Sequence, residues 1–175
     1  MMVRFLIPFV AVLLFLLEPE FAKFSPIHFE NYTAYLVPRF LILYLIFISI
    51  YYNRKRAVIY GLIFGLLYDV FYIDIIGLYA VLYPAVCFLA GWSVKFIHQH
   101  LLITTVLAVL LVAVMEIILY EFFLLIHLTT MPFDTFFNGR LLPTIGANLL
   151  FLLILGWAFK YLIDARLLER ERSMT

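Results

Sequence analysis

Long apolar runs separated by short polar segments dominate the pattern along this chain. A helix that crosses a bilayer needs about 20 predominantly apolar residues, and six runs reach or approach that length. They lie at about residues 3–22, 36–52, 57–72, 75–97, 101–126 and 141–159. The pattern predicts an all-α integral membrane protein, in which residues 1–175 form a single membrane domain. We expect a compact bundle of six transmembrane helices, followed by a cytoplasmic tail over residues 160–175 in which the last helix continues out of the membrane.

The third run is the shortest, and a count of five helices would merge or bury it. The basic Arg-Lys-Arg sequence before it and the two acidic residues around its end favour a separate crossing. The count of six therefore depends most on this segment.

Composition supports a bilayer as the solvent. The chain is 67% hydrophobic and 19% aromatic, whereas soluble domains are about 45–50% apolar. The formal net charge is +1 and there is no long basic block, so nucleic acid is not expected as a partner, whereas membrane lipid is. The single cysteine, Cys87, cannot form an intramolecular disulfide.

Lysine and arginine gather at one end of the predicted helices. Short cytoplasmic loops carry these residues in excess, and placing the N-terminus inside puts nine of the twelve there. The nine are Arg4, Arg54, Lys55, Arg56, Lys95, Lys160, Arg166, Arg170 and Arg172. Only Lys23, Arg39 and Arg140 then fall on the outer side. We therefore expect both termini to be cytoplasmic.

Small residues recur every fourth position along the third run, at Ala57, Gly61 and Gly65, and Asp69 continues the series. Residues spaced in this way form a ridge on one face of a helix, and small residues on it let another helix approach closely. The ridge predicts a packing seam within the bundle, and a dimer interface made by the same face is the alternative.

Asp69 lies thirteen residues after Arg56, or about 20 Å along a helix, so it belongs in the outer third of the membrane. A carboxylate there should face protein rather than lipid. Its candidate partners are Arg39, Arg140 and backbone donors of a neighbouring helix, with Glu18 closing the first helix on the same side. We interpret these charges as a structural ion-pair layer; a contact surface for another protein and a proton or ion path are the alternatives.

The fifth run contains two acidic residues, Glu116 and Glu121, which helical geometry places about 140° apart. They cannot share one site, and Glu116 is deep enough to require a protein environment. No nucleophile has a base at a recognisable spacing, there is no phosphate-binding glycine loop, and no histidine or cysteine cluster has metal-ligand spacing. The sequence therefore predicts a protein that is not an enzyme and has no cofactor.

Several segments, in order, resemble the bacterial rod shape-determining MreD family. They are RFLIPFVAVLLFLLE, VPRFLILYLIFIS, AVIYGLIFGLLYD with IIGLYA, the glutamate in VMEIILYEFF, and RLLPTIGANLL, which contains Asn148. The resemblance implies a bundle similar to the substrate-binding subunits of energy-coupling-factor vitamin transporters. It also implies a non-enzymatic member of the elongation machinery in the bacterial inner membrane. Implied partners are MreC, the glycosyltransferase RodA with its class B transpeptidase, and, directly or indirectly, the MreB filament.

A small-molecule-binding subunit of a vitamin transporter is the alternative function. The first run has Pro8 and Ala11 but not the Ala-xxx-Ala pair with which such subunits dock their energising module. A scaffold predicts no bound small molecule and a stable complex with a single-span partner, whereas a transporter subunit predicts a ligand-lined cavity open to the outer face. The residues expected to carry helix packing or partner contacts are Gly61, Gly65, Asp69, Arg39, Arg140, Glu116 and Asn148.

Overall fold

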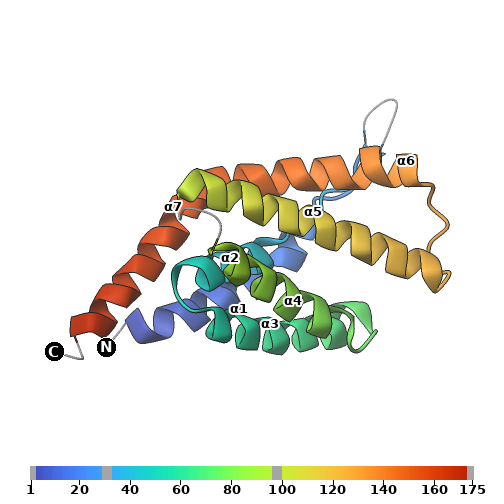
Figure 1. Ribbon diagram of the computed structural model, residues 1–175. Coiled ribbons are helices and arrows are strands. Elements are labelled where there is room, and N and C mark those ends of the chain that lie inside the picture. The colour runs from blue at the N-terminus through green and yellow to red at the C-terminus, as the bar shows by residue number, and fades with distance from the viewer. Residues whose placement is uncertain (1–2, 29–32, 96–99, 173–175) are drawn as a thin grey trace.

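Helices make up most of the computed structural model of the chain (Figure 1), which describes residues 3–28, 33–95 and 100–172. They are α1 (Val3–Ala22), α2 (Phe40–Tyr51), α3 (Arg54–Tyr68), α4 (Leu78–Ser93), α5 (Leu101–Leu125), α6 (Phe133–Phe136) and α7 (Leu142–Arg172). A π-helical segment, η1 (Asp69–Ile73), extends α3, and a second, η2 (Phe137–Leu141), joins α6 to α7. Strands β1 (Ile27–His28) and β2 (Thr33–Ala34) pair antiparallel.

Four helical stretches of the described residues are long and apolar enough to cross a membrane. They are Phe5–Ala22, Arg54–Ile73, Leu101–Leu125 and Phe133–Glu169. The all-α membrane class predicted from the sequence is confirmed. Two further apolar helices, Phe40–Tyr51 and Leu78–Ser93, are shorter, and at about 1.5 Å per residue they span only about 18 and 24 Å.

Both short helices begin later than their apolar runs. The segment before α2 holds Pro38, and α2 starts at Phe40 rather than near residue 36. Gly77 precedes α4 with a φ of +110°, a conformation that glycine adopts without strain, and α4 starts at Leu78 rather than 75. The run at 75–97 also reaches residues 96 and 97, which lie outside the described residues.

Helix α7 is longer than the run that predicted it. Helical structure continues from Phe133 to Arg172, so residues 160–172 prolong the last helix, while 173–175 lie outside the described residues. Figure 1 shows α7 bending near its middle, so that its second half runs toward the start of α1. The buried side chains of Phe159 and Ile163 lie in this part.

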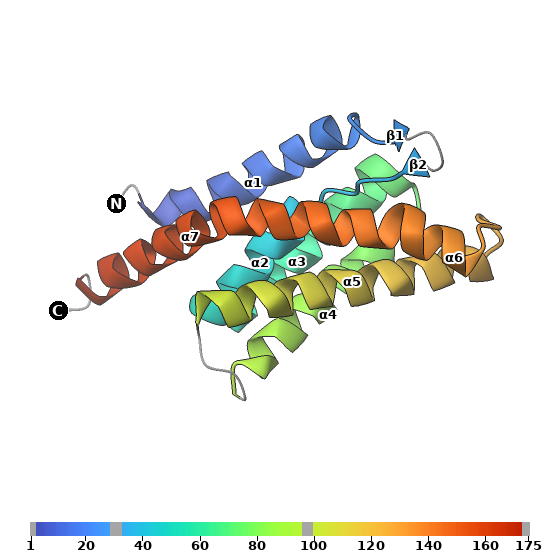
Figure 2. The same cartoon turned by 90° about the horizontal axis from the view of Figure 1, so that it is seen from above.

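Helix α2 occupies the centre of the bundle. All of its residues are buried, and it contacts α1, α3, α4, α5 and α7. Figure 2 shows that the start of α1 and the end of α7 lie at one end of the molecule. The strand pair and α6 lie at the other, which we call the hairpin end. Because α2 is enclosed by protein, its short length exposes no polar helix end to lipid.

The outer faces of the surrounding helices are apolar. On α5, Leu102, Val106 and Leu110 follow one another at every fourth position, and each is more than half exposed. Such a stripe would be unfavourable in water. These faces are therefore suited to contact with lipid.

Candidate functional site

The ridge of small residues on α3 packs against α4. A Cβ added at Gly61 would lie 3.0 Å from the backbone of Tyr83 and Pro84. One added at Gly65 would overlap the carbonyl group of Tyr79, with the carbonyl carbon only 2.7 Å away. The predicted seam therefore lies within the chain, and α4 covers the face that the alternative would use for a dimer.

Asp69, at the end of this ridge, caps the start of α4. Its carboxylate is fully buried and accepts hydrogen bonds from the backbone N–H groups of Gly77, Tyr79 and Ala80, at 2.8, 2.7 and 3.0 Å. The first N–H groups of a helix lack intrahelical partners, and a negative charge is favourable beside them. Asp69 is therefore satisfied by backbone donors at the start of a neighbouring helix, one of the partners proposed from the sequence, and not by Arg39 or Arg140.

We expect Asp69→Leu to destabilise the bundle more than Asp69→Asn. Leucine leaves three N–H groups without an acceptor, and the two that are fully buried, those of Tyr79 and Ala80, cost about 1–3 kcal/mol each when unsatisfied, whereas asparagine keeps one acceptor oxygen. Thermal unfolding of the purified chain in detergent measures the difference. Asp74→Asn is the matched control, because Asp74 is exposed and adopts a φ of 58°, which asparagine tolerates. Equal stability of the leucine and asparagine variants would contradict the capping role.

The start of α2 is held by side chains from α1 and α7. Glu18 accepts a hydrogen bond from the backbone N–H of Leu41 at 2.8 Å. Asn148 accepts one from the N–H of Arg39 at 2.9 Å and donates one to the carbonyl of Val37 at 2.9 Å. The two short helices are thus stabilised in the same way. Polar side chains from longer neighbouring helices accept hydrogen bonds from the backbone N–H groups at the start of each.

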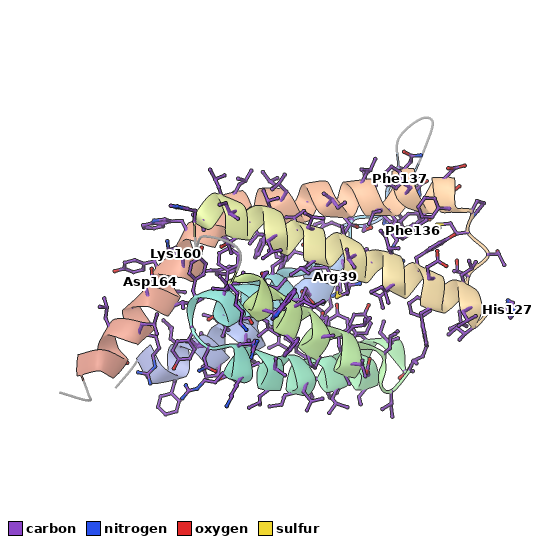
Figure 3. The ribbon with its side chains drawn as sticks, viewed as in Figure 1. Arg39, His127, Phe136, Phe137, Lys160 and Asp164 are labelled. Carbon is purple, nitrogen blue, oxygen red and sulfur yellow. The ribbon has the colours of Figure 1, made fainter. Side chains whose placement is uncertain are left out.

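A buried ion pair lies beside these two helix starts. The Nε of Arg39 donates to Oε1 of Glu116 at 2.6 Å, and both side chains are almost fully buried. Arg39 also donates to the hydroxyl of Tyr79 at 3.0 Å, and its guanidinium lies 5.9 Å from the centre of the Tyr68 ring. Arg140 is 3.4 Å from the other Glu116 oxygen and about one-third exposed. Figure 3 shows Arg39 in the interior, between α5 and the lower helices.

Together these side chains form one cluster toward the hairpin end, which we call the buried polar layer. Its members are Glu18, Arg39, Asp69, Tyr79, Glu116, Arg140 and Asn148. Tyr79 links the Asp69 cap to the Arg39–Glu116 pair, because its backbone N–H donates to Asp69 and its hydroxyl accepts from Arg39. Gly61 and Gly65 lie outside it, on the seam, and Glu121 is exposed. Every hydrogen bond named above for the layer ends on another group of the same chain, so these bonds stabilise the bundle.

Two residues were not singled out from the sequence: Tyr79, a member of the layer, and Thr144, which lies beside it. Tyr79 carries no recognisable signal, because nothing in its neighbourhood separates it from the other tyrosines. Thr144 accepts a hydrogen bond from the N–H of Val37 at 3.2 Å. Its position four residues before Asn148 puts two polar residues on one face of an apolar helix. That spacing was a usable signal.

Catalytic or metal-binding groupings do not stand out among the described residues. No group of three or more His, Cys, Asp or Glu side chains in that part of the chain could hold a metal ion. Cys87 is fully buried. The buried polar layer is therefore the main cluster of interacting charged and polar side chains in the described part of the bundle.

Comparison with known proteins identifies the family. The family model described as rod shape-determining protein MreD matches residues 3–165. The rod shape-determining protein MreD of Bacillus subtilis (strain 168) is 39% identical over 159 residues, covering 91% of this chain and 92% of the relative. The chain belongs to the MreD family. The resemblance read from the sequence is thereby confirmed, and membership of the MreD family supports a role in determining rod shape.

No solved structure matches this MreD-family chain. The similarity to energy-coupling-factor subunits therefore stays a prediction. The alternative function, a vitamin-transporter subunit, gains no support from the family.

Proposed function

We propose that this MreD-family chain is a non-enzymatic scaffold of the elongation machinery in the bacterial inner membrane. It binds MreC and the synthase pair of RodA and its class B transpeptidase, and connects directly or indirectly to the MreB filament. Its contribution is a rigid membrane surface that holds these partners in fixed positions for peptidoglycan synthesis.

The contacts that the buried charged side chains make within the chain support this proposal most directly. Asp69 caps α4, Glu18 caps α2, and Arg39 pairs with Glu116. Charged residues inside membrane proteins often mark transport or proton paths, but here two of them cap helix starts and the other two pair with each other. A bundle whose polar groups are used in this way is suited to presenting a fixed surface.

The path of the chain supports six crossings. Successive helices α1, α2, α3, α4, α5 and α7 alternate in direction, so that the described parts of α1 and α7 begin and end at the same side (Figure 2). The short helices α2 and α4 complete their crossings with the segments before them, around Pro38 and Gly77. With most of the basic residues placed inside, both termini are cytoplasmic and the hairpin end faces outward.

Cysteine accessibility in intact cells tests this topology. After Cys87→Ala removes the native thiol, a single cysteine at Asp134 should react with a membrane-impermeant maleimide, and one at Lys55 should react only after the membrane is permeabilised. The position at Asp134 lies at the hairpin end and the one at Lys55 at the opposite end of α3. Labelling of position 55 but not 134 in intact cells would invert the proposed orientation.

Co-purification tests the scaffold itself. The chain, solubilised in mild detergent, should retain MreC and the two synthases in fixed proportions, as measured by quantitative mass spectrometry. An unrelated six-span protein purified in the same way is the control. Recovery of the chain with an ATPase module, and without MreC, would replace the scaffold with the transport function.

A further inference from the structure

A cavity of about 220 Å³ opens beside the buried polar layer at the hairpin end. It lies between the end of α1, the segment before α2, η1, the start of α4 and η2. Its polar lining residues are Glu18, Arg39, Tyr68, Tyr72, Tyr79 and Arg140. At about 30 Å³ for each water in the liquid, this is room for about seven water molecules, or for one compact polar group.

Two charged side chains of opposite sign line this cavity with unused hydrogen-bonding atoms. Glu18 is 1% exposed. One of its carboxylate oxygens accepts a hydrogen bond from the backbone N–H of Leu41, and the other makes no hydrogen bond of standard geometry within the described structure, although the side chain of Tyr68, which also lines the cavity, lies within reach of this carboxylate. Arg140 contacts Glu116 through one terminal nitrogen, but its buried Nε has no partner among the described residues. Buried groups of this kind are costly unless something satisfies them.

The two unused atoms define the chemistry of the group that fits. The Glu18 oxygen requires a donor, preferably cationic, and the Arg140 Nε requires an acceptor, preferably anionic. A single occupant that satisfies both is a small zwitterion with an ammonium at one end and a phosphate or carboxylate at the other.

The surroundings of the cavity point to a lipid as the source of this group. Exposed aromatic side chains follow or precede lining residues of the cavity in the sequence: Phe21 and Phe24 lie within two residues of Ala22, and Phe71 directly precedes Tyr72. Aromatic residues of this kind gather where membrane meets water, at the depth of the headgroups. A phospholipid at this level can place its headgroup in the cavity and leave its chains along the apolar helix faces.

We propose that this cavity binds the headgroup of an aminophospholipid, of the phosphatidylethanolamine class. The ammonium donates to the free oxygen of Glu18, and the phosphate accepts from Nε of Arg140. The bound lipid links the ends of α1, η1 and η2, and so stabilises the hairpin end. The proposal concerns lipid alone, so its failure would leave the scaffold proposal and the binding of MreC unaffected.

Lipid binding to the purified full-length chain in detergent tests the proposal. Native mass spectrometry compares phosphatidylethanolamine, phosphatidylcholine and phosphatidylglycerol of identical acyl chains. The trimethylated ammonium of phosphatidylcholine has no N–H to donate, and phosphatidylglycerol has no cation. We expect phosphatidylethanolamine to bind about tenfold more tightly than either, because one hydrogen bond to a charged group is strong enough for that difference.

Substitutions test whether the preference for phosphatidylethanolamine arises at this cavity. Glu18→Gln should remove the preference for phosphatidylethanolamine over phosphatidylcholine, and Arg140→Gln should weaken binding of all three lipids. Glu20→Gln is the matched control, because Glu20 lies two residues away, is 61% exposed and pairs with Lys23. If Glu18→Gln does not fold, the ranking of the three lipids on the unaltered chain decides the question.

Three results would overturn the proposal. One is equal binding of the three lipids to the unaltered chain. Another is a preference that survives Glu18→Gln in a folded protein. The third is binding of free phosphoethanolamine as tight as that of the lipid, which would make the ligand a soluble zwitterion.

Discussion

Replacing Gly65 with leucine is expected to remove most of the folded protein from the membrane. A Cβ at this position already overlaps the carbonyl of Tyr79 and lies 2.9 Å from Cα of Ala80, and both are backbone atoms that cannot move aside alone. The larger side chain forces α3 and α4 apart along their whole seam, which is the most extensive helix contact in the bundle. Gly65→Ala should cost about 1–3 kcal/mol, and leucine more.

Gly146 supplies the matched control for this prediction. It is also a helical glycine, but a Cβ added there meets nothing within 4 Å. Gly146→Ala should be neutral or stabilising, because alanine favours a helix by about 1 kcal/mol over glycine. Membrane abundance and the thermal midpoint in detergent measure both substitutions. Equal tolerance of alanine at the two positions would show that the seam does not require a glycine.

Removing Glu116 alone is expected to be nearly as damaging. Glu116→Leu leaves the guanidinium of Arg39 buried without its carboxylate, and breaking a buried pair from one side costs about 3–5 kcal/mol. Arg140 also loses its contact with Glu116 but is partly exposed, so it can turn toward water. Glu121→Leu, on the same helix but at an exposed position, is the control and should change stability by about 0.5 kcal/mol or less.

The double variant Arg39→Met with Glu116→Leu should recover much of this loss. Replacing both partners of a buried ion pair with apolar residues is often neutral, because no unpaired charge remains. The backbone N–H of Arg39, which donates to Asn148, is kept in the double variant. Thermal unfolding of the four proteins gives a double-mutant cycle. A double variant as unstable as the sum of the single ones would show that the pair is not an isolated unit.

The sequence predicted the class of fold well, because long apolar runs indicate directly that lipid is the solvent of a helix. It also predicted the seam, since the small residues at Ala57, Gly61 and Gly65 share a helix face whatever helix covers them. It predicted helix lengths less well for the two short helices. Pro38 and Gly77 mark these starts locally, but the side chains that hold the starts, Asp69, Glu18 and Asn148, act from other helices and cannot be assigned from the local sequence.

The partners of the buried charges were harder to predict. Asp69 and Arg39 were predicted to be possible partners because both were expected near the outer face, yet Asp69 binds backbone N–H groups of α4 and Arg39 binds Glu116. Arg39 and Glu116 are 77 positions apart in the chain, and only the packing of α2 against α5 brings them together. The depth of a charged residue in the membrane limits which residues can be its partner. The rotation of each helix about its own axis then decides which of them is.

Depletion of the chain in a rod-shaped bacterium tests the scaffold most directly, with cell width and the positions of MreC and the two synthases followed by microscopy. Expression of the unaltered chain should restore normal width, Gly146→Ala should do so too, and Gly65→Leu should not. The scaffold function predicts that depleted cells become wide or round and that MreC and the synthases disperse, while vitamin uptake continues. Cells that keep their rod shape and the positions of these proteins, but require an added vitamin to grow, would contradict it.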